Sequence, residues 1–387
     1  MGFHTADPED IKAGRITDVY FARTMQVLKA KGIDKRVRAE FIAKSLPDGW
    51  AWAVFAGLEE AAHLLEGLNI NVRAMQEGEI FYPYQPVMEI EGNYTDFCVY
   101  ETALLGLICQ ASGIATRASR LRMLAGHRQV ISFGARRMHP VLAPMIERNA
   151  FIGGCDGVSV IKSAELIEAG PMGTMPHALI IVLGDTVTAT RAFDEVVEKA
   201  VRRTSLIDTF NDEKFEAVRV AEALGEKLYA VRLDTPASRR GNFRRILEEV
   251  RWELDIRGFN RVKLFVSGGI KEEDIPGLNE FVDAYGIGTT ISNAPVVDFA
   301  MDIVEVEGRP FAKRGKWSGS KSVLRCPDCG GPGVIVPRTD KPEPCTCGGN
   351  KADILAPFMQ SGRLEYQLPA PAALRERILE HLKKLPL

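Results

Sequence analysis

The chain has 387 residues, of which 46% are hydrophobic and 26% charged, as in an ordinary soluble globular protein. This length predicts two or three domains with a large core. The net charge of −2 excludes the broad basic field of a general nucleic-acid binder. The amino terminus has no apolar signal segment, and the apolar runs near Ala51 and Ala178 are far shorter than a membrane span. We therefore expect a cytoplasmic protein with no membrane segment.

The first 111 residues mix helical patterns with strand patterns. Helices are expected at residues 15–31, 51–68 and 101–109, and strands at 41–46 and twice within 72–92. Residues 87–92 alternate apolar and polar side chains, which is typical of an antiparallel strand. Residues 101–109 are almost wholly apolar, which predicts a helix buried on most sides. Since strands and helices do not alternate regularly, this part is expected to form a separate α+β domain.

From residue 112 strands and helices alternate, which indicates a parallel sheet or barrel. Strands are expected at 129–133, 157–159 and 205–209 and in the runs beginning at Leu228, Val262 and Asp283. Helices are expected at 116–125, 140–148, 162–169, 191–201 and 213–224. About six such units are fewer than the eight of a complete barrel, and no GxGxxG follows the first strand. This favours a truncated or irregular α/β barrel over a doubly wound sheet.

The last three expected strands each end in polar or glycine residues. These are Arg232 and Asp234, then Ser267-Gly268-Gly269, then Gly286-Ile287-Gly288-Thr289. Ligands of barrels bind at the carboxyl ends of the strands, where glycines let backbone N–H groups approach an anion. The stretch therefore predicts half of a site for a phosphorylated sugar. Glycine turns also close strands for steric reasons alone, so this alternative stays open.

Arginines and a phenylalanine mark the end of the first barrel strand. Phe133 offers a stacking face, and Arg136 and Arg137 offer forks for a carboxylate or phosphate. The alternative is a core phenylalanine beside solvated arginines. Arg232 and Asp234 lie two apart on one strand and so face one side, as ligand-binding groups or as a structural ion pair.

His177 follows a glycine-rich turn, Gly173-Thr174-Met175-Pro176, and precedes an apolar run. A histidine at the mouth of a strand can act as a nucleophile, a base or a phosphate acceptor. A structural histidine is the alternative. Asp208, at the preceding strand end, is expected to join Arg232 and Asp234.

The seven cysteines fall into two groups. Cys98, Cys109 and Cys155 are isolated in apolar surroundings, as small buried side chains are. The other four are clustered, namely Cys326, Cys329, Cys345 and Cys347. A CxxC pair with a distant second pair is typical of a zinc ribbon, and four thiolates close a structural site. The second pair is CxC, tighter than usual, and reduced surface thiols are the alternative.

Three domains are therefore expected. An α/β sandwich comprises residues 1–111 with a return segment at 295–322, which contains a strand at 301–306 and a basic turn. The irregular α/β barrel comprises 112–294 and carries the catalytic site. A small zinc-knuckle or ribbon module and a terminal helix comprise 323–387, the helix with Leu374, Ile378 and Leu382 on one face.

Several motifs in one order make the chain resemble the nicotinate phosphoribosyltransferases across most of residues 15–325. They are TDVY at 17–20, FAGLEEAAHLLEGL at 55–68, the run at 91–120, SFGARR at 132–137, GTMPH at 173–177, LIDTF at 206–210, VRLDTP at 231–236, VSGGI at 266–270 and YGIGT at 285–289. SGIAT, within the run at 91–120, is shared with quinolinate phosphoribosyltransferases, whereas FGxRR, GTMPH and RLDT are more specific to the nicotinate branch. The chain departs where TPAS follows Asp234 in place of SGDL.

The resemblance implies an ATP-coupled ligase of NAD salvage that makes nicotinate mononucleotide and pyrophosphate from nicotinate and phosphoribosyl pyrophosphate, with Mg²⁺. It implies a homodimer, or a higher oligomer, with shared active sites. Phe133 and the partner's Tyr20 should sandwich the pyridine. Arg136 and Arg232 should bind the anionic groups and Asp234 the ribose, while ATP phosphorylates His177. The phosphate should lie against Ser267, Gly268, Gly269, Gly286, Gly288 and Thr289, and further contacts are expected from Thr174, Asp208 and Arg137.

Two rival functions follow from the same residues. A quinolinate phosphoribosyltransferase would decarboxylate its substrate, but it needs more cationic contacts for two carboxylates, and GTMPH argues against it. A nucleic-acid- or protein-binding protein acting through the zinc ribbon is favoured only by the basic turn at 313–321.

Overall fold

The computed structural model describes residues 3–340 and 343–386, which form two compact units. Residues up to 116 and from 295 to 386 make up unit 1, and residues 117–294 make up unit 2. The segment from 323 on, expected as a module of its own, groups with unit 1. The long helix α5 (Glu101–Ala125) contributes its first part to unit 1 and its second part to unit 2.

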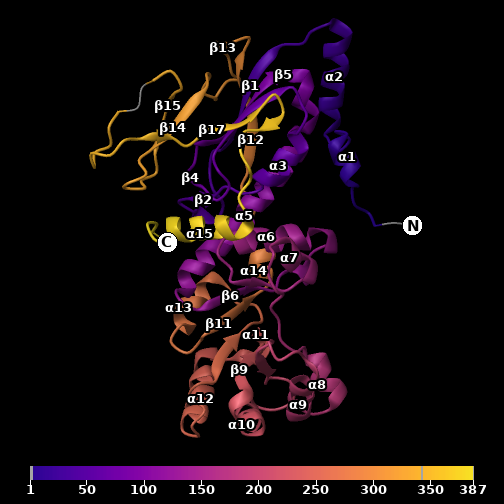
Figure 1. Cartoon of the computed structure of the whole chain (residues 1–387), viewed down its shortest axis with the longest axis vertical. Coiled ribbons are helices and arrows are strands. Elements are labelled where there is room, and N and C mark those ends of the chain that lie inside the picture. The colour runs from indigo at the N-terminus through magenta and orange to yellow at the C-terminus, as the bar shows by residue number, and fades with distance from the viewer. Residues whose placement is uncertain (1–2, 341–342, 387) are drawn as a thin grey trace. The chain divides into compact units, whose positions relative to one another are not determined.

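Unit 1 is built on a seven-stranded antiparallel sheet with the order β13-β12-β1-β5-β3-β17-β18. Its strands are β1 (Arg36–Ala43), β3 (Ile70–Ala74), β5 (Pro86–Asn93), β12 (Phe299–Val306), β13 (Arg309–Pro310), β17 (Ala356–Gln360) and β18 (Arg363–Leu364). Its helices are α1 (Pro8–Lys12), α2 (Val19–Lys31), α3 (Leu58–Leu65), α4 (Tyr94–Phe97) and α15 (Pro371–Leu382), besides α5 (Figure 1).

The two faces of this sheet differ in character because side chains alternate along each strand. On one face Phe41 and Met88 pack in a core with α3 and α5, which contribute Leu58 and Leu104. The other face carries ion pairs instead. They are Arg38 with Glu305 (2.7 Å), Lys321 with Glu40 (2.7 Å) and Arg73 with Asp353 (2.6 Å).

Two small sheets complete unit 1. One has the order β15-β14-β16, with β14 (Lys321–Arg325), β15 (Val334–Pro337) and β16 (Ala352–Asp353), and the other pairs β2 (Ala53–Val54) with β4 (Ile80–Phe81). Helix α15 buries Leu374, Ile378 and Leu382, which confirms the predicted face. Short 3₁₀ turns lie at Pro47–Gly49 (η1) and Cys98–Tyr100 (η2).

Unit 2 is an open half-barrel of six parallel strands with the order β7-β6-β11-β10-β9-β8. The strands are β6 (Gln129–Ser132), β7 (Gly157–Val158), β8 (Arg203–Leu206), β9 (Leu228–Leu233), β10 (Lys263–Val266) and β11 (Ala284–Ile287). Strands β7 and β8 are the two edges, so the curled sheet stays open between them. The expected irregular barrel is therefore confirmed as a half-barrel, and residues 159–202 connect its edges.

The helices of unit 2 are α6 (Ala143–Ile152), α7 (Ile161–Leu166), α8 (His177–Leu183), α9 (Thr186–Val196), α10 (Glu213–Leu224), α11 (Ala237–Arg240), α12 (Phe243–Asp255), α13 (Ile275–Leu278) and α14 (Thr289–Ser292). The 3₁₀ turns are η3 (Ala135–Arg137), η4 (Pro140–Leu142), η5 (Gly225–Lys227) and η6 (Glu272–Asp274). Helix α10 spans the residues predicted for it. Helices α6 and α9 are shifted by three to five residues, and α7 starts as predicted within one residue but ends three residues earlier.

Three sequence predictions are corrected by the fold. The helix expected at 51–68 begins only at Leu58, because Gly57 has a left-handed φ of 90° and Ala53–Val54 pair with β4. The helices expected at 101–109 and 116–125 are one helix, α5. His177 begins helix α8 rather than a strand, because the apolar run after it is helical.

Helix α5 with the turns before it, residues 94–125, is long and apolar enough to cross a membrane by length and composition alone. Its apolar side chains are nevertheless part of the protein interior, with Leu104, Ile108, Ile114 and Leu121 almost fully buried. These buried side chains indicate a core helix rather than a membrane span.

Candidate active site at the carboxyl edge of the half-barrel

Arg232 is the centre of the polar groups at the carboxyl edge of the half-barrel. Its side chain leaves β9 and donates hydrogen bonds to Thr174 Oγ1 (2.8 Å) and Ser267 Oγ (2.9 Å). Its Nη2 lies 3.3 Å from Asp234 Oδ1. Thr174 belongs to the loop before α8 and Ser267 follows β10, so one guanidinium links three segments that are far apart in sequence. Burial lowers the pKa of Arg232, while the nearby Asp234 carboxylate raises it.

Phe133 forms an aromatic platform beneath this guanidinium. The guanidinium carbon lies 5.2 Å from the centroid of the Phe133 ring, and Phe265 packs beside that ring at 5.9 Å. A Cβ on Gly286 would come within 2.5 Å of the Phe133 ring. Gly286 therefore has to be glycine for the ring to lie flat at the strand end, which gives this residue a packing role besides the predicted contact with phosphate.

The two arginines after Phe133 lie in η3 and are exposed. Arg136 is close enough to Arg232 for its charge to lower the pKa of that residue further. The structure thus brings Arg136 to the cationic side of the site. Arg137 donates its backbone N–H to Gly134, and no side-chain contact joins it to Arg232 or Asp234 within the described residues.

A second chain of contacts links three of the predicted residues. His177 Nε2 lies 3.2 Å from Asp208 Oδ1, and Asp208 Oδ2 accepts a hydrogen bond from the backbone N–H of Asp234 (3.2 Å). The Asp208 side chain is only 2% exposed, whereas that of His177 is 37% exposed. Burial raises the pKa of Asp208, and the neighbouring His177 lowers it. A buried carboxylate therefore orients an accessible imidazole, an arrangement that suits nucleophilic histidine chemistry.

The loop after β10 has the geometry expected of an anion-binding turn. Gly268 and Gly269 both have positive φ, 83° and 72°, which only glycine adopts easily. A Cβ at Gly268 would lie 2.8 Å from the carbonyl oxygen of Asp234. Gly288 follows β11 and approaches Phe133, and Thr289 begins the short turn of helix α14. Backbone from three strand ends is thus held close together.

Tyr20 belongs to unit 1, on helix α2, where its hydroxyl lies 3.4 Å from Asp18 Oδ2. Its side chain is exposed, and of α2 only Phe21 is buried. Tyr20 is therefore available to contact another molecule. The other predicted substrate-binding residues belong to unit 2.

Arg240 is a residue of this edge that the motifs did not single out. It lies at the end of α11, two residues after the TPAS segment that departs from the nicotinate branch, and donates to backbone carbonyls of Thr235 and Ser267. The adjacent arginines at 239 and 240, a few residues after the end of β9, were the signal available in the sequence.

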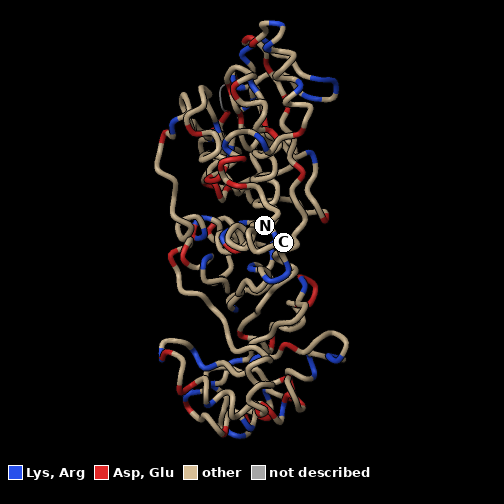
Figure 2. Tube along the Cα trace, turned by 90° about the vertical axis from the view of Figure 1, so that its right-hand side faces the viewer, with Lys and Arg blue, Asp and Glu red and all other residues tan. Residues whose placement is uncertain are grey.

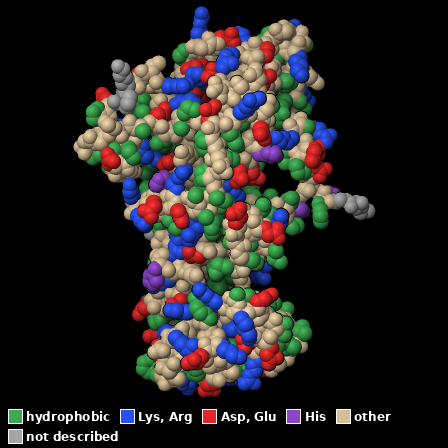
Figure 3. Space-filling view, viewed as in Figure 1, with side chains coloured by type: hydrophobic (Ala, Val, Ile, Leu, Met, Phe, Trp, Pro, Cys, Tyr) green, Lys and Arg blue, Asp and Glu red, His purple; other side chains and the backbone are tan. Residues whose placement is uncertain are grey.

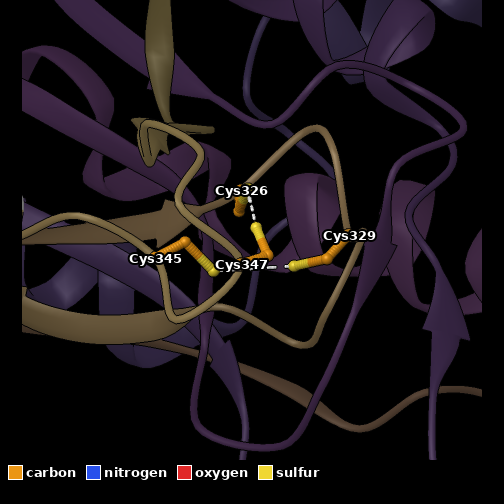
Figure 4. A group of neighbouring side chains, drawn as sticks. All are labelled: Cys326, Cys329, Cys345 and Cys347. Carbon is orange, nitrogen blue, oxygen red and sulfur yellow. Dashed lines mark hydrogen bonds between the residues drawn. The ribbon is translucent and has the colours of Figure 1, made fainter.

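The four clustered cysteines lie together in unit 1 (Figure 4). All four sulfur atoms are within 4.8 Å of one another, and the Sγ–Sγ distances are 3.5 Å for Cys326–Cys347 and 3.6 Å for Cys329–Cys345. Tetrahedral zinc with Zn–S bonds of about 2.3 Å requires sulfurs ~3.8 Å apart. These distances are too long for disulfides and fit a four-thiolate site.

Charges of both signs alternate over each unit. Figure 2 shows Lys and Arg interspersed with Asp and Glu along the chain, and the face in Figure 3 shows the same mixture. This agrees with the net charge of −2. The face in Figure 3 shows no continuous basic patch among the described residues.

Comparisons with known proteins identify relatives of this chain. Residues 18–112 match the model of the quinolinate phosphoribosyl transferase N-terminal domain, and residues 114–302 match that of its C-terminal domain. The chain is 28% identical over 355 residues to nicotinate phosphoribosyltransferase pncB1 of Mycobacterium tuberculosis, covering 81% of this chain and 78% of that protein.

Solved structures have the same fold. A crystal structure of nicotinate-nucleotide pyrophosphorylase from Pyrococcus furiosus is 54% identical, with a TM-score of 0.98 over 100% of both chains. Human nicotinic acid phosphoribosyltransferase is 20% identical, with a TM-score of 0.76 over 96% of this chain and 94% of that one. Together with the half-barrel edge built around Phe133 and Arg232, these matches show that the chain belongs to the phosphoribosyltransferase family that includes the quinolinate and nicotinate enzymes.

Proposed function

We propose that the protein is a nicotinate phosphoribosyltransferase of NAD salvage, acting in the cytoplasm. It would convert nicotinate and phosphoribosyl pyrophosphate into nicotinate mononucleotide and pyrophosphate. The observation that carries this proposal is the guanidinium of Arg232 above the ring of Phe133, at 5.2 Å. A flat aromatic acid fits such a pair, because its ring can stack on Phe133 while a guanidinium holds its carboxylate.

The reaction requires positioning more than proton transfer. Displacement of pyrophosphate builds positive oxocarbenium character at C1 of the ribose, and the pyridine nitrogen is already nucleophilic. The glycines after β10 and β11, with Ser267 and Thr289, would bind the 5′-phosphate, and Asp234 the ribose. Holding nitrogen and C1 in line then supplies most of the rate enhancement, without a general base.

Magnesium suits the same edge. The carboxylates of Asp208 and Asp234 are oxygen donors that this cation prefers, and the backbone N–H of Asp234 donates to Asp208 at 3.2 Å, which keeps the two residues together. When bound, the cation would neutralise charge on the departing pyrophosphate. Arg232 and Arg136 add positive charge on the same side.

ATP coupling would proceed through His177. The imidazole attacks the γ-phosphorus of ATP, a P–N bond forms, and ADP leaves with the electrons of the broken P–O bond. Since Nε2 faces Asp208, the carboxylate orients the ring and stabilises its positive charge. The phosphohistidine carries new negative charge, which would bias binding of the substrates or release of pyrophosphate.

We further propose a homodimer with shared active sites, in which the partner's Tyr20 covers the pyridine from the side opposite Phe133. Two exposed apolar surfaces support this. Helix α2 exposes Val19, Tyr20 and Val27, and helix α8, which starts at His177, exposes Ile181 and Val182. Exposed apolar surfaces of this kind mark protein contacts.

A structural zinc ion would occupy the four-cysteine site, held by Cys326, Cys329, Cys345 and Cys347. Their sulfur separations support this assignment. Four thiolates fill the tetrahedral sphere, so the ion would contribute stability rather than catalysis.

Quinolinate phosphoribosyl transfer is the second candidate, because both matching family models carry that description. The two functions differ in product chemistry, since quinolinate loses its second carboxylate as carbon dioxide. Purified protein with Mg²⁺ and phosphoribosyl pyrophosphate should form mononucleotide from nicotinate, and ATP should stimulate it with release of ADP. Labelled quinolinate should give no carbon dioxide. Absence of product from nicotinate, or efficient decarboxylation of quinolinate, would overturn the first proposal.

A further inference from the structure

Arg240 binds the backbone of the glycine turn from the side that carries its carbonyl oxygens. Its Nη2 donates to the carbonyl of Ser267 (3.3 Å) and to that of Gly268, and its Nε donates to the carbonyl of Thr235 (3.0 Å). One side chain thus joins the segment after β9 to the turn after β10. The planar fork of arginine, with several donors in fixed directions, is suited to such a role.

Fixing these carbonyls also fixes the direction of two N–H groups. In a planar trans peptide the C=O and the N–H of the same unit point in opposite directions. No peptide bond is cis in the described residues. The carbonyl of Ser267 shares its peptide plane with the N–H of Gly268, and the carbonyl of Gly268 with the N–H of Gly269. Arg240 therefore directs both N–H groups away from itself.

Those two N–H groups are free to bind a ligand. Neither donates a hydrogen bond to any group within the described residues. Both belong to residues with positive φ, and no atom lies within 4 Å of the position a Cβ would take at Gly269, so the turn is open on that side. Gly268 is half-buried and Gly269 is exposed, so an anion can reach the turn from solvent.

The surroundings keep the Arg240 guanidinium in place. Its central carbon lies 4.4 Å from the centroid of the Phe243 ring, so the planar group is held against an aromatic face. Burial lowers the pKa of Arg240, and the carboxylates of Asp274 and Asp234 oppose that shift. Arg239, its neighbour, is exposed to solvent.

We propose that Arg240 is a positioning residue that aims the N–H groups of Gly268 and Gly269 at the 5′-phosphate of phosphoribosyl pyrophosphate. The inference rests on the proposed function and adds a residue to it. Arg240 also contacts the segment that departs from the nicotinate branch after Asp234, through the carbonyl of Thr235. In this chain an arginine acting through backbone carbonyls organises the phosphate turn.

The test compares Arg240→Ala, Arg240→Lys and the matched control Arg239→Ala. Ribose 5-phosphate is the binding probe, titrated calorimetrically without nicotinate, and KM values for both substrates are measured in parallel. Arg240→Ala should weaken ribose 5-phosphate binding and raise KM for phosphoribosyl pyrophosphate by about ten- to a hundredfold, the range of charge-assisted hydrogen bonds. KM for nicotinate should stay within about twofold. Arg240→Lys should be intermediate and Arg239→Ala unchanged.

Two results would overturn the inference. One is unaltered ribose 5-phosphate affinity in a folded Arg240→Ala protein. The other is an equal loss for both substrates, which indicates a general structural role. If Arg240→Ala does not fold, Arg240→Lys decides the matter by the same comparison. Failure of the proposed function is distinguishable, because the wild-type protein would then not turn over nicotinate, whereas the ribose 5-phosphate titration tests the phosphate turn separately.

Discussion

At the scale of single residues, the candidate site depends on contacts between side chains that come from different strands. Hydrogen bonds to Thr174 and Ser267 fix the position of the Arg232 side chain. The neighbouring Phe133 ring fits against β11 only because residue 286 has no side chain. Asp208 in turn orients His177. Each of these dependencies gives a substitution whose effect is specific.

Replacing Phe133 by Ala should weaken nicotinate binding by about 1–3 kcal/mol, because stacking and apolar contact with the ring are lost. The fold should survive, since the ring is half-buried at the strand end rather than in the main core. Calorimetric titration with nicotinate measures the change, and thermal unfolding checks the fold. A folded variant with wild-type affinity would exclude Phe133 from the pyridine site.

Replacing His177 by Ala should separate two activities. ATP hydrolysis and ATP stimulation should disappear, because no nucleophile remains to accept the γ-phosphate, while slow transfer without ATP continues. Mononucleotide and ADP are measured in parallel. Thr188→Ala, on helix α9 outside the site, is a control that should keep both activities. If ADP formation coupled to product continues at the wild-type rate without His177, the phosphohistidine role is wrong.

At the scale of elements, the cysteine cluster begins directly after strand β14, which contributes buried side chains to the core of unit 1. Cys326 follows β14 directly. Within that strand Val323 is fully buried, and the Arg325 guanidinium pairs with Glu79 at 2.5 Å. A metal ion that closes the loops on either side would therefore also restrain the end of β14. Binding energy of a structural metal contributes to folding in this way.

Replacing Cys329 by Ser should lower bound zinc from about one equivalent per chain to far less, and should loosen the segment after β14. Metal analysis of freshly purified, reduced protein gives the first quantity, and proteolysis within residues 326–350 gives the second. Cys109→Ser is the control, because Cys109 lies apart from the cluster, and should keep its zinc. If the freshly purified, reduced wild-type protein contains no zinc, the proposed structural zinc site is wrong.

At the scale of the whole molecule, Tyr20 and the half-barrel edge belong to different units, and each is accompanied by an exposed apolar helix. A dimer in which α2 of one chain serves the half-barrel of the other would bury such surfaces and complete two sites at once. An isologous dimer does this with one type of contact.

Coexpression of Tyr20→Ala and Arg232→Ala chains should restore activity that each variant lacks. If the site is shared, half of the dimers are hybrids and each hybrid has one intact site, so about a quarter of wild-type activity returns. Separately purified variants mixed at the moment of assay serve as the control for slow exchange. No recovery in hybrids isolated with two different tags would exclude the shared site.

Local patterns in the sequence were sufficient for much of the fold. The strand at 87–92, the buried face of Leu374, Ile378 and Leu382, and the strand that begins at Leu228 are confirmed, because each is recognised from the local periodicity or β-rich composition of its own residues. The apolar run after His177 was misread because a short run does not distinguish a buried strand from a helix. Gly57 delays the start of helix α3 through its left-handed backbone conformation, which periodicity does not report.

The sequence by itself indicated a truncated or irregular α/β barrel with glycine-rich strand ends, a four-cysteine cluster and the motifs of its family. Only the tertiary structure decided which partners each residue has. Arg232 lies over Phe133, Asp208 contacts both His177 and the backbone of Asp234, and Arg240 binds the carbonyl of Ser267. The residues in each of these contacts are 26 to 99 positions apart in the sequence. Such contacts depend on how strands are ordered and curled, and strand order leaves no periodic trace in the sequence.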